Sequence, residues 1–115
     1  MQELIIPLRW EHLDELLDHI NTRLANNRFP TILRIRTQTV VEELFYALLS
    51  LDGVENARLR CIYPASQSIL LQYRNEKGVL EPDLTVLQSL LTRECTYGVK
   101  AQITAGNCMI TVGEK

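Results

Sequence analysis

Residues 31–51, TILRIRTQTVVEELFYALLSL, decide the fold because their first part fits two kinds of secondary structure. In ILRIRT, residues 32–37, apolar and basic side chains alternate as they do in a half-buried strand. No helix-breaking residue, however, separates this segment from the apolar helix predicted over residues 39–51. Residues 32–37 are therefore either a strand of their own or the first turns of one long helix.

The two alternatives place the start of the helix differently. If residues 32–37 form a strand, Thr37 or Thr39 caps the following helix, whereas one long helix begins at Pro30 or Thr31. Gly53 ends the helix in either case. The apolar side chains after residue 39 share one face of the helix in both alternatives: Val40, Val41, Leu44, Phe45 and Leu48.

The segments before this stretch predict a strand and a helix. Residues 3–7, ELIIP, are short and apolar and end in a proline that suits an edge strand. From residue 9 to 25, apolar side chains recur three and four residues apart, which predicts an amphipathic helix. Its expected buried face consists of Trp10, Leu13, Leu17, Ile20 and Leu24.

The second half of the chain predicts two hairpins joined by a helix. Apolar residues alternate with polar ones over residues 58–63 and 69–74, around the turn-like PASQ. A helix is expected from Pro82 to just before Gly98, with an inner stripe of Leu84, Leu87, Leu90, Leu91 and Cys95. Residues 99–105 and 108–112 then alternate as a closing hairpin, for which Gly106 and Asn107 supply the turn.

The sum of these elements predicts a single α+β domain over residues 1–115. We expect a two-layer sandwich with a mainly antiparallel sheet of four or five strands and about three helices on one face. The alternative, with residues 32–37 as a strand, is a ferredoxin-like βαββαβ fold with an additional N-terminal helix. A strand over residues 108–112 at the sheet edge would favour a homodimer by strand pairing.

Composition and charge give no support to a nucleic-acid-binding or membrane protein. A net charge of −2 and an isoelectric point near 5.7 give no global attraction to nucleic acid, although Arg58, Arg60 and Arg74 form a potential local basic patch. The chain lacks an apolar run long enough to span a bilayer, and its acidic N-terminus does not resemble a signal peptide. We therefore expect a cytoplasmic protein without nucleic-acid or membrane partners.

The cysteines and histidines do not form a recognisable metal or catalytic motif. Cys61, Cys95 and Cys108 are odd in number and far apart, which favours reduced, mostly buried thiols. His12 and His19 lie seven residues apart on an acidic helix face, whereas a helical two-histidine metal site places them four apart. No metal site is expected.

With residues 31–51 as one helix, the whole chain resembles the small form of the GHKL ATPase fold, the anti-sigma-factor serine kinase type. QELIIPLRWEHLDELLDHINTRL is similar to the opening strand and helix of that family, and VVEELFYALL to its glutamate-bearing second helix. ARLRCIYPASQSILLQYRNEKG is similar to its central hairpin and glycine-containing ATP motif, and VKAQITAGNCMITVGEK to its closing hairpin.

The resemblance implies roles for three residues and also shows where the family pattern is missing. It implies that Glu43 orients the attacking water and that Asn75, followed by Gly78, binds the nucleotide, if the chain is active. The family's magnesium-binding asparagine is replaced by Ala47, and VLEPD leaves almost no room for a lid over ATP. Equally, Glu43 could be the polar edge of a helix and residues 75–78 a solvated connection.

Three functions follow from these interpretations. The favoured one is a non-catalytic regulatory domain that binds a protein partner through its sheet edge or first helices and needs no cofactor. The second is a divergent ATP- and magnesium-dependent, kinase-like enzyme that uses Glu43 and Asn75. The third is a ferredoxin-like ligand-binding or dimerisation module, which requires residues 32–37 to be a strand.

Overall fold

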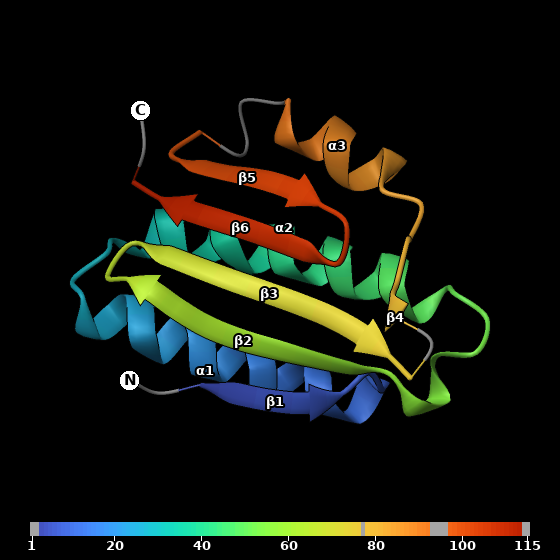
Figure 1. Ribbon diagram of the computed structural model, residues 1–115. Coiled ribbons are helices and arrows are strands. Elements are labelled where there is room, and N and C mark those ends of the chain that lie inside the picture. Colours follow the sequence, from blue (N-terminus) through green and yellow to red (C-terminus); the bar gives the residue numbers. More distant parts are fainter. Residues whose placement is uncertain (1–2, 77, 93–96, 114–115) are drawn as a thin grey trace.

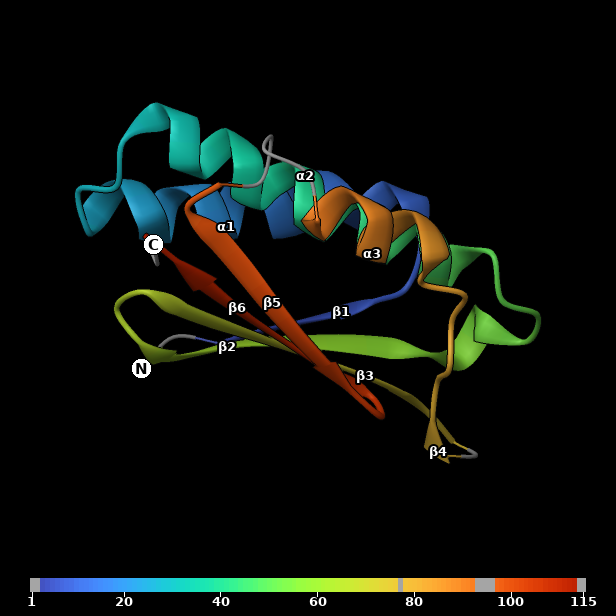
Figure 2. The same cartoon turned by 90° about the horizontal axis from the view of Figure 1, so that it is seen from above.

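A computed structural model describes residues 3–76, 78–92 and 97–113 of the chain. One antiparallel sheet forms one layer, and the helices lie together on one of its faces (Figures 1 and 2). This architecture confirms the expected α+β two-layer sandwich. The elements in chain order are β1 (Leu4–Pro7), η1 (Trp10–His12), α1 (Leu13–Asn26), α2 (Thr31–Leu49), η2 (Val54–Asn56), β2 (Arg58–Ala65), β3 (Ser68–Asn75), β4 (Gly78–Val79), α3 (Thr85–Leu91), β5 (Val99–Thr104) and β6 (Asn107–Val112).

The ambiguous segment is helical, because α2 runs without interruption from Thr31 to Leu49. The ferredoxin-like alternative, which requires a strand over residues 32–37, is therefore wrong. Tertiary contacts hold this half of the helix: the Arg36 guanidinium donates a hydrogen bond to the Tyr97 carbonyl, and Leu33 packs against Gly98. A Cβ at Gly98 would lie 2.5 Å from Cδ2 of Leu33, and φ at Gly98 is +87°, so both packing and backbone require glycine there.

The strand order in the sheet is β1-β2-β3-β6-β5, and β4 pairs with the end of β3. The strand at residues 108–112 is thus interior, because Cys108 of β6 faces Leu71 of β3 on one side and Ile103 of β5 on the other. Its expected position at the sheet edge is therefore wrong, and this strand is not available for the strand pairing from which a homodimer was expected. The turn of this hairpin lies one residue earlier than expected, since Thr104 already pairs with Asn107.

The core lies between the helices and the inner face of the sheet. The predicted alternation in the central hairpin is confirmed: Leu59, Cys61, Tyr63, Ile69, Leu71 and Tyr73 are all buried. On α1 the fully buried side chains are Leu13, Leu16, Ile20 and Leu24. Trp10 was expected in this row but is 61% exposed, because it precedes α1 in η1 and packs against Tyr46 instead, with ring centroids 5.2 Å apart.

The third helix is shorter than expected. Although a start at Pro82 was predicted, α3 begins at Thr85, where the backbone N–H and hydroxyl of Thr85 both donate hydrogen bonds to the Asp83 carboxylate. Leu87 is its fully buried side chain, and Leu84, Leu90 and Leu91 are partly buried against the core. Cys95, the last member of the predicted stripe, lies outside the described residues.

The outer face of the sheet carries no second layer of described elements (Figure 2). Side chains on this face alternate with the buried ones, and they include Arg58, Arg60, Arg74, Ile62, Leu70 and Met109. Of the helices described, none combines the length and the apolar character needed to cross a bilayer. The molecule therefore presents one open sheet face and one helical face.

The packing of α2 predicts unequal effects for two aliphatic side chains on the same helix. Leu44 is 1% exposed, whereas Ile35 is 53% exposed. We expect Leu44→Ala to lower the free energy of unfolding by about 3 kcal/mol, because it leaves a cavity in the core. The control Ile35→Ala should change it by less than about 0.5 kcal/mol. Urea unfolding followed by circular dichroism measures both, and equal losses would contradict this packing.

Candidate functional site

Glu43 lies on α2 and lines two neighbouring cavities between α2 and α3. Their volumes are about 330 and 370 Å3, and Val86 of α3 borders both. The adjacent Glu42 instead accepts a hydrogen bond of 3.0 Å from the Tyr46 hydroxyl, which raises the pKa of Tyr46. Of this pair, Glu43 is therefore the carboxylate that lines the cavities, whereas Glu42 is bound to Tyr46.

The electrostatics of these two cavities oppose a polyphosphate. Glu43 lines both cavities, Asp83 lines the one of about 330 Å3, and no described lining residue of either is basic. The hydrogen bonds from the Thr85 hydroxyl and backbone lower the pKa of Asp83, so this carboxylate is charged at neutral pH. Two carboxylates without a cation would repel a triphosphate, and Ala47, in the same lining, offers no ligand to a magnesium ion that could bridge them.

Asn75 and Gly78 lie elsewhere, at the hairpin that joins β3 to β4. The two residues face one another in the ladder. Figure 2 shows β4 curled away from the helical layer that carries Glu43. Asn75 lines a separate hollow, and this hollow shares no described residue with the cavities at Glu43. The structure therefore does not bring the three candidate nucleotide-site residues around one cavity.

The hollow at Asn75 is lined by three arginines, more basic residues than line any other described cavity. It has a volume of about 530 Å3 and is lined by Pro7, Arg9, Asn56, Ala57, Arg58, Arg74, Asn75 and Glu76. Arg58 and Arg74 belong to the basic patch that the sequence indicated, whereas Arg60, in the next row, forms an ion pair of 2.6 Å with Glu3. Sequence reasoning missed Arg9, which joins the group because β1 pairs with β2.

The two described cysteines are core residues rather than nucleophiles. Cys61 of β2 and Cys108 of β6 are fully buried, and each pairs with Leu71 of β3 from opposite sides. Because β3 lies between them, the two cysteines are too far apart to form a disulfide. Burial raises the pKa of Cys61 to about 11 and that of Cys108 to about 12. Thiols with such pKa values are neutral at physiological pH, and only the thiolate is a good nucleophile.

The two histidines have different partners. His12 Nδ1, at the end of η1, lies 3.3 Å from a carboxylate oxygen of Glu15 in α1, whereas His19 Nδ1 lies 2.5 Å from the Tyr63 hydroxyl of β2. Arg23 also covers the Tyr63 ring, with its guanidinium carbon 4.7 Å from the ring centroid. Within the part of the chain that the structure describes, no three metal-ligating side chains converge.

The chain matches no protein-family model, and a search of curated proteins found no significant match. The roles of its residues therefore rest on the geometry described above.

The buried thiols predict a pH dependence of stability. The unperturbed thiol pKa is 9.0, and both buried thiols have raised values in the folded protein. The contribution of each thiol to stability is therefore complete below pH 9 and is lost as the pH rises through about 11 for Cys61 and about 12 for Cys108. In a Cys95→Ser variant, we expect a colorimetric thiol reagent to find no reactive thiol in the folded protein at about pH 8 and two in urea. Rapid reaction of the folded variant would contradict this burial.

Proposed function

We propose that this chain is a non-catalytic regulatory domain that binds a protein partner, built on the scaffold of the anti-sigma-factor kinase type. The order of its main elements, strand, two helices, hairpin, helix, hairpin, is the order that the resemblance requires. We propose that the chain is not catalytic because Glu43 and Asn75, the candidate residues of a nucleotide site, line different cavities. We also propose a cytoplasmic location, since the described cysteines, Cys61 and Cys108, are buried free thiols that need no oxidising compartment.

The observation that carries this proposal is the separation of Glu43 from Asn75. An ATPase needs its catalytic carboxylate and its nucleotide-binding groups around one ligand, because positioning supplies much of the rate enhancement. Here Glu43 faces an acidic space between α2 and α3, and Asn75 lines an arginine-rich hollow at the β3–β4 hairpin. The scaffold keeps the glutamate-bearing helix without assembling a nucleotide site around it.

The connection between β4 and α3 supports the same conclusion. Only residues 80–84 separate these elements, and Leu80 is buried in the core. A connection this short and anchored at its start cannot close over a nucleotide, and closure of a lid is what normally excludes water in phosphoryl transfer. The cavities at Glu43 are bordered instead by Leu87 and Leu90 of α3.

Exposed apolar side chains support binding to another protein. Ile32 and Ile35 lie one turn apart on the outer side of α2 and are more than half exposed, as is Trp10 on η1. The open face of the sheet adds the partly exposed side chains of Ile62, Leu70 and Met109. Large apolar side chains and uncovered sheet faces are common features of surfaces that become buried in complexes.

Calorimetry with ATP and magnesium tests the proposal. We expect no saturable heat at nucleotide concentrations up to about 2 mM, because the carboxylates of Glu43 and Asp83 repel the triphosphate. Hydrolysis measured on the same samples should equal that of the Glu43→Gln variant. Saturable binding of ATP that Glu43→Gln alters, or hydrolysis that Glu43→Gln abolishes, would show an active nucleotide site at Glu43 and overturn the proposal.

A further inference from the structure

Arg58 and Arg74 form a like-charged pair, and no described ion pair joins either of them to an acidic side chain. They are direct partners in the ladder between β2 and β3, and both are exposed on the open face of the sheet. The next residues in the same row are Pro7 on β1 and Val79 on β4, so no acidic side chain flanks the pair within it. Like charges directly opposite one another destabilise a sheet, so this pair weakens the fold.

The hollow beside this pair adds a third guanidinium. Arg9, in the connection after β1, lines it together with Arg58 and Arg74. Glu76 is the carboxylate among the described lining residues, and no described ion pair joins it to any of the three arginines. Because the whole chain carries a net charge of −2, this is a local positive field on an acidic protein.

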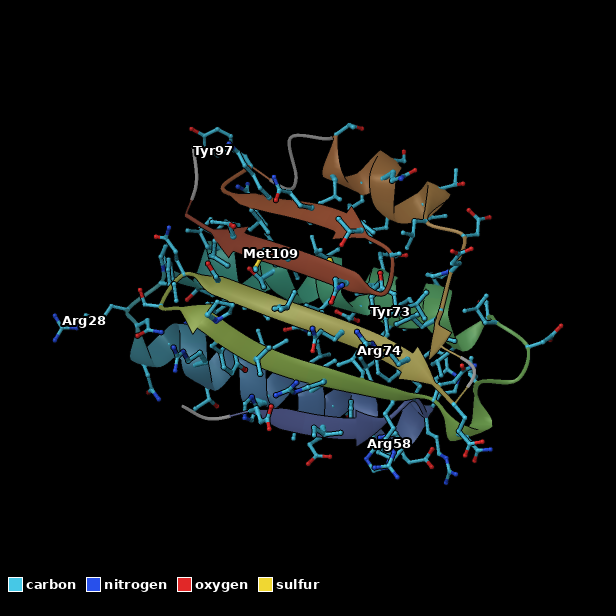
Figure 3. All side chains as sticks on the ribbon, in the orientation of Figure 1. Arg28, Arg58, Tyr73, Arg74, Tyr97 and Met109 are labelled. Atoms are coloured by element: carbon cyan, nitrogen blue, oxygen red, sulfur yellow. The ribbon has the colours of Figure 1, made fainter. Side chains whose placement is uncertain are left out.

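An apolar stripe crosses the same face of the sheet further along the strands. Ile62, Leu70 and Met109 are ladder partners on β2, β3 and β6, and all three are partly exposed. Figure 3 shows Met109 nearer the middle of the sheet, with Arg58 and Arg74 at one end of it. Ile62 lies four residues after Arg58 on the same strand, so about 13 Å separate the stripe from the arginines.

We propose that this open face binds one short segment of the protein partner, which carries acidic side chains at one end and large apolar side chains about 13 Å away. The carboxylates would enter the hollow of Arg9, Arg58 and Arg74, since a guanidinium fork binds a carboxylate in a bidentate manner. The apolar side chains would cover Ile62, Leu70 and Met109. This inference rests on the proposed function and names the surface and the chemistry of the partner.

Nucleic acid fits this face less well than an acidic protein segment. A phosphate backbone would place further charges along the apolar stripe, where Ile62 and Met109 offer no charge or hydrogen bond to phosphate. The net charge of −2 also gives no long-range attraction to a polyanion. A protein segment that combines carboxylates with apolar side chains can bind the arginines and cover the apolar stripe at the same time.

Selection from a phage library of random peptides, each of roughly twelve residues so that an extended peptide spans both sites, tests this proposal. We expect the selected peptides to combine acidic and large apolar residues. As synthetic peptides they should bind the Arg58→Gln/Arg74→Gln variant at least about tenfold more weakly than the unaltered protein. Leu70→Thr should also weaken binding, through loss of apolar contact.

Arg28→Gln is the matched control, because Arg28 is an exposed arginine at the opposite end of the molecule (Figure 3). It should leave the affinity for these peptides unchanged. The stability of the double variant separates a binding role from a structural one. If the arginines serve binding, removing the like-charged pair should raise the midpoint of thermal unfolding, whereas arginines that support the fold would lower it when replaced.

Several results would overturn the proposal. They are the failure to select any peptide, selected peptides without acidic residues, equal binding to the double variant, or complete competition by about 10 mM inorganic phosphate, which would indicate a small-anion site. Peptides that bind the double variant equally well would leave the proposed function standing and exclude only this surface. Nucleotide binding at Glu43, by contrast, would overturn the proposed function and would not alter peptide binding at this surface. The two failures can therefore be told apart.

Discussion

The packing of α2 against the inner face of the sheet is the interaction on which the rest of the structure depends. Six of its side chains are buried, and the helix contacts α1, α3, β5 and β6. Each fully buried aliphatic or aromatic side chain contributes about 1.5 to 3 kcal/mol of hydrophobic stabilisation before the entropy of folding is subtracted. With α1, α2 and α3 packed on this face, no described helix covers the other face of the sheet.

This one-sided arrangement separates two surfaces with opposite chemistry. The helical side contains the acidic space between α2 and α3, where Glu43 and Asp83 lie. The open sheet side contains the arginine hollow and the apolar stripe. Asn75 belongs to the second surface because β3 continues beyond β6 and turns back through β4 away from the helices (Figure 2). The position of this hairpin therefore separates Asn75 and Gly78 from Glu43.

Most of the fold could be predicted from the sequence because hydrophobic periodicity is a local property. The alternation in β2 and β3 directly gave their buried face. Residues 32–37 could not be assigned, because ILRIRT fits both a strand and a helix and contacts with Tyr97 and Gly98 decide between them. The interior position of β6 was missed for a related reason: the β5–β6 hairpin can be recognised locally, but which of its strands joins β3 cannot.

The same limit applies to the site. The helical position of Glu43 was predictable, but the cavity it lines depends on where α3 packs. Arg58 and Arg74 were recognised as a patch, whereas their direct opposition depends on the register of the hairpin, which contains an irregularity between Ile62 and Ala65. The contribution of Arg9 required the pairing of β1 with β2. Residues from three segments meet there, and no sequence spacing marks them as a group.

Methyl NMR spectra of the protein, recorded with and without a selected acidic peptide, test the central claim most directly, that the open sheet face is the binding surface. The account predicts shifts for Ile62, Leu70 and Met109, whose side chains lie on that face. It also predicts that the methyl groups of Val86 and Leu87, which line the cavity at Glu43, remain unchanged. Shifts confined to Val86 and Leu87 would place the ligand between α2 and α3 and contradict the account.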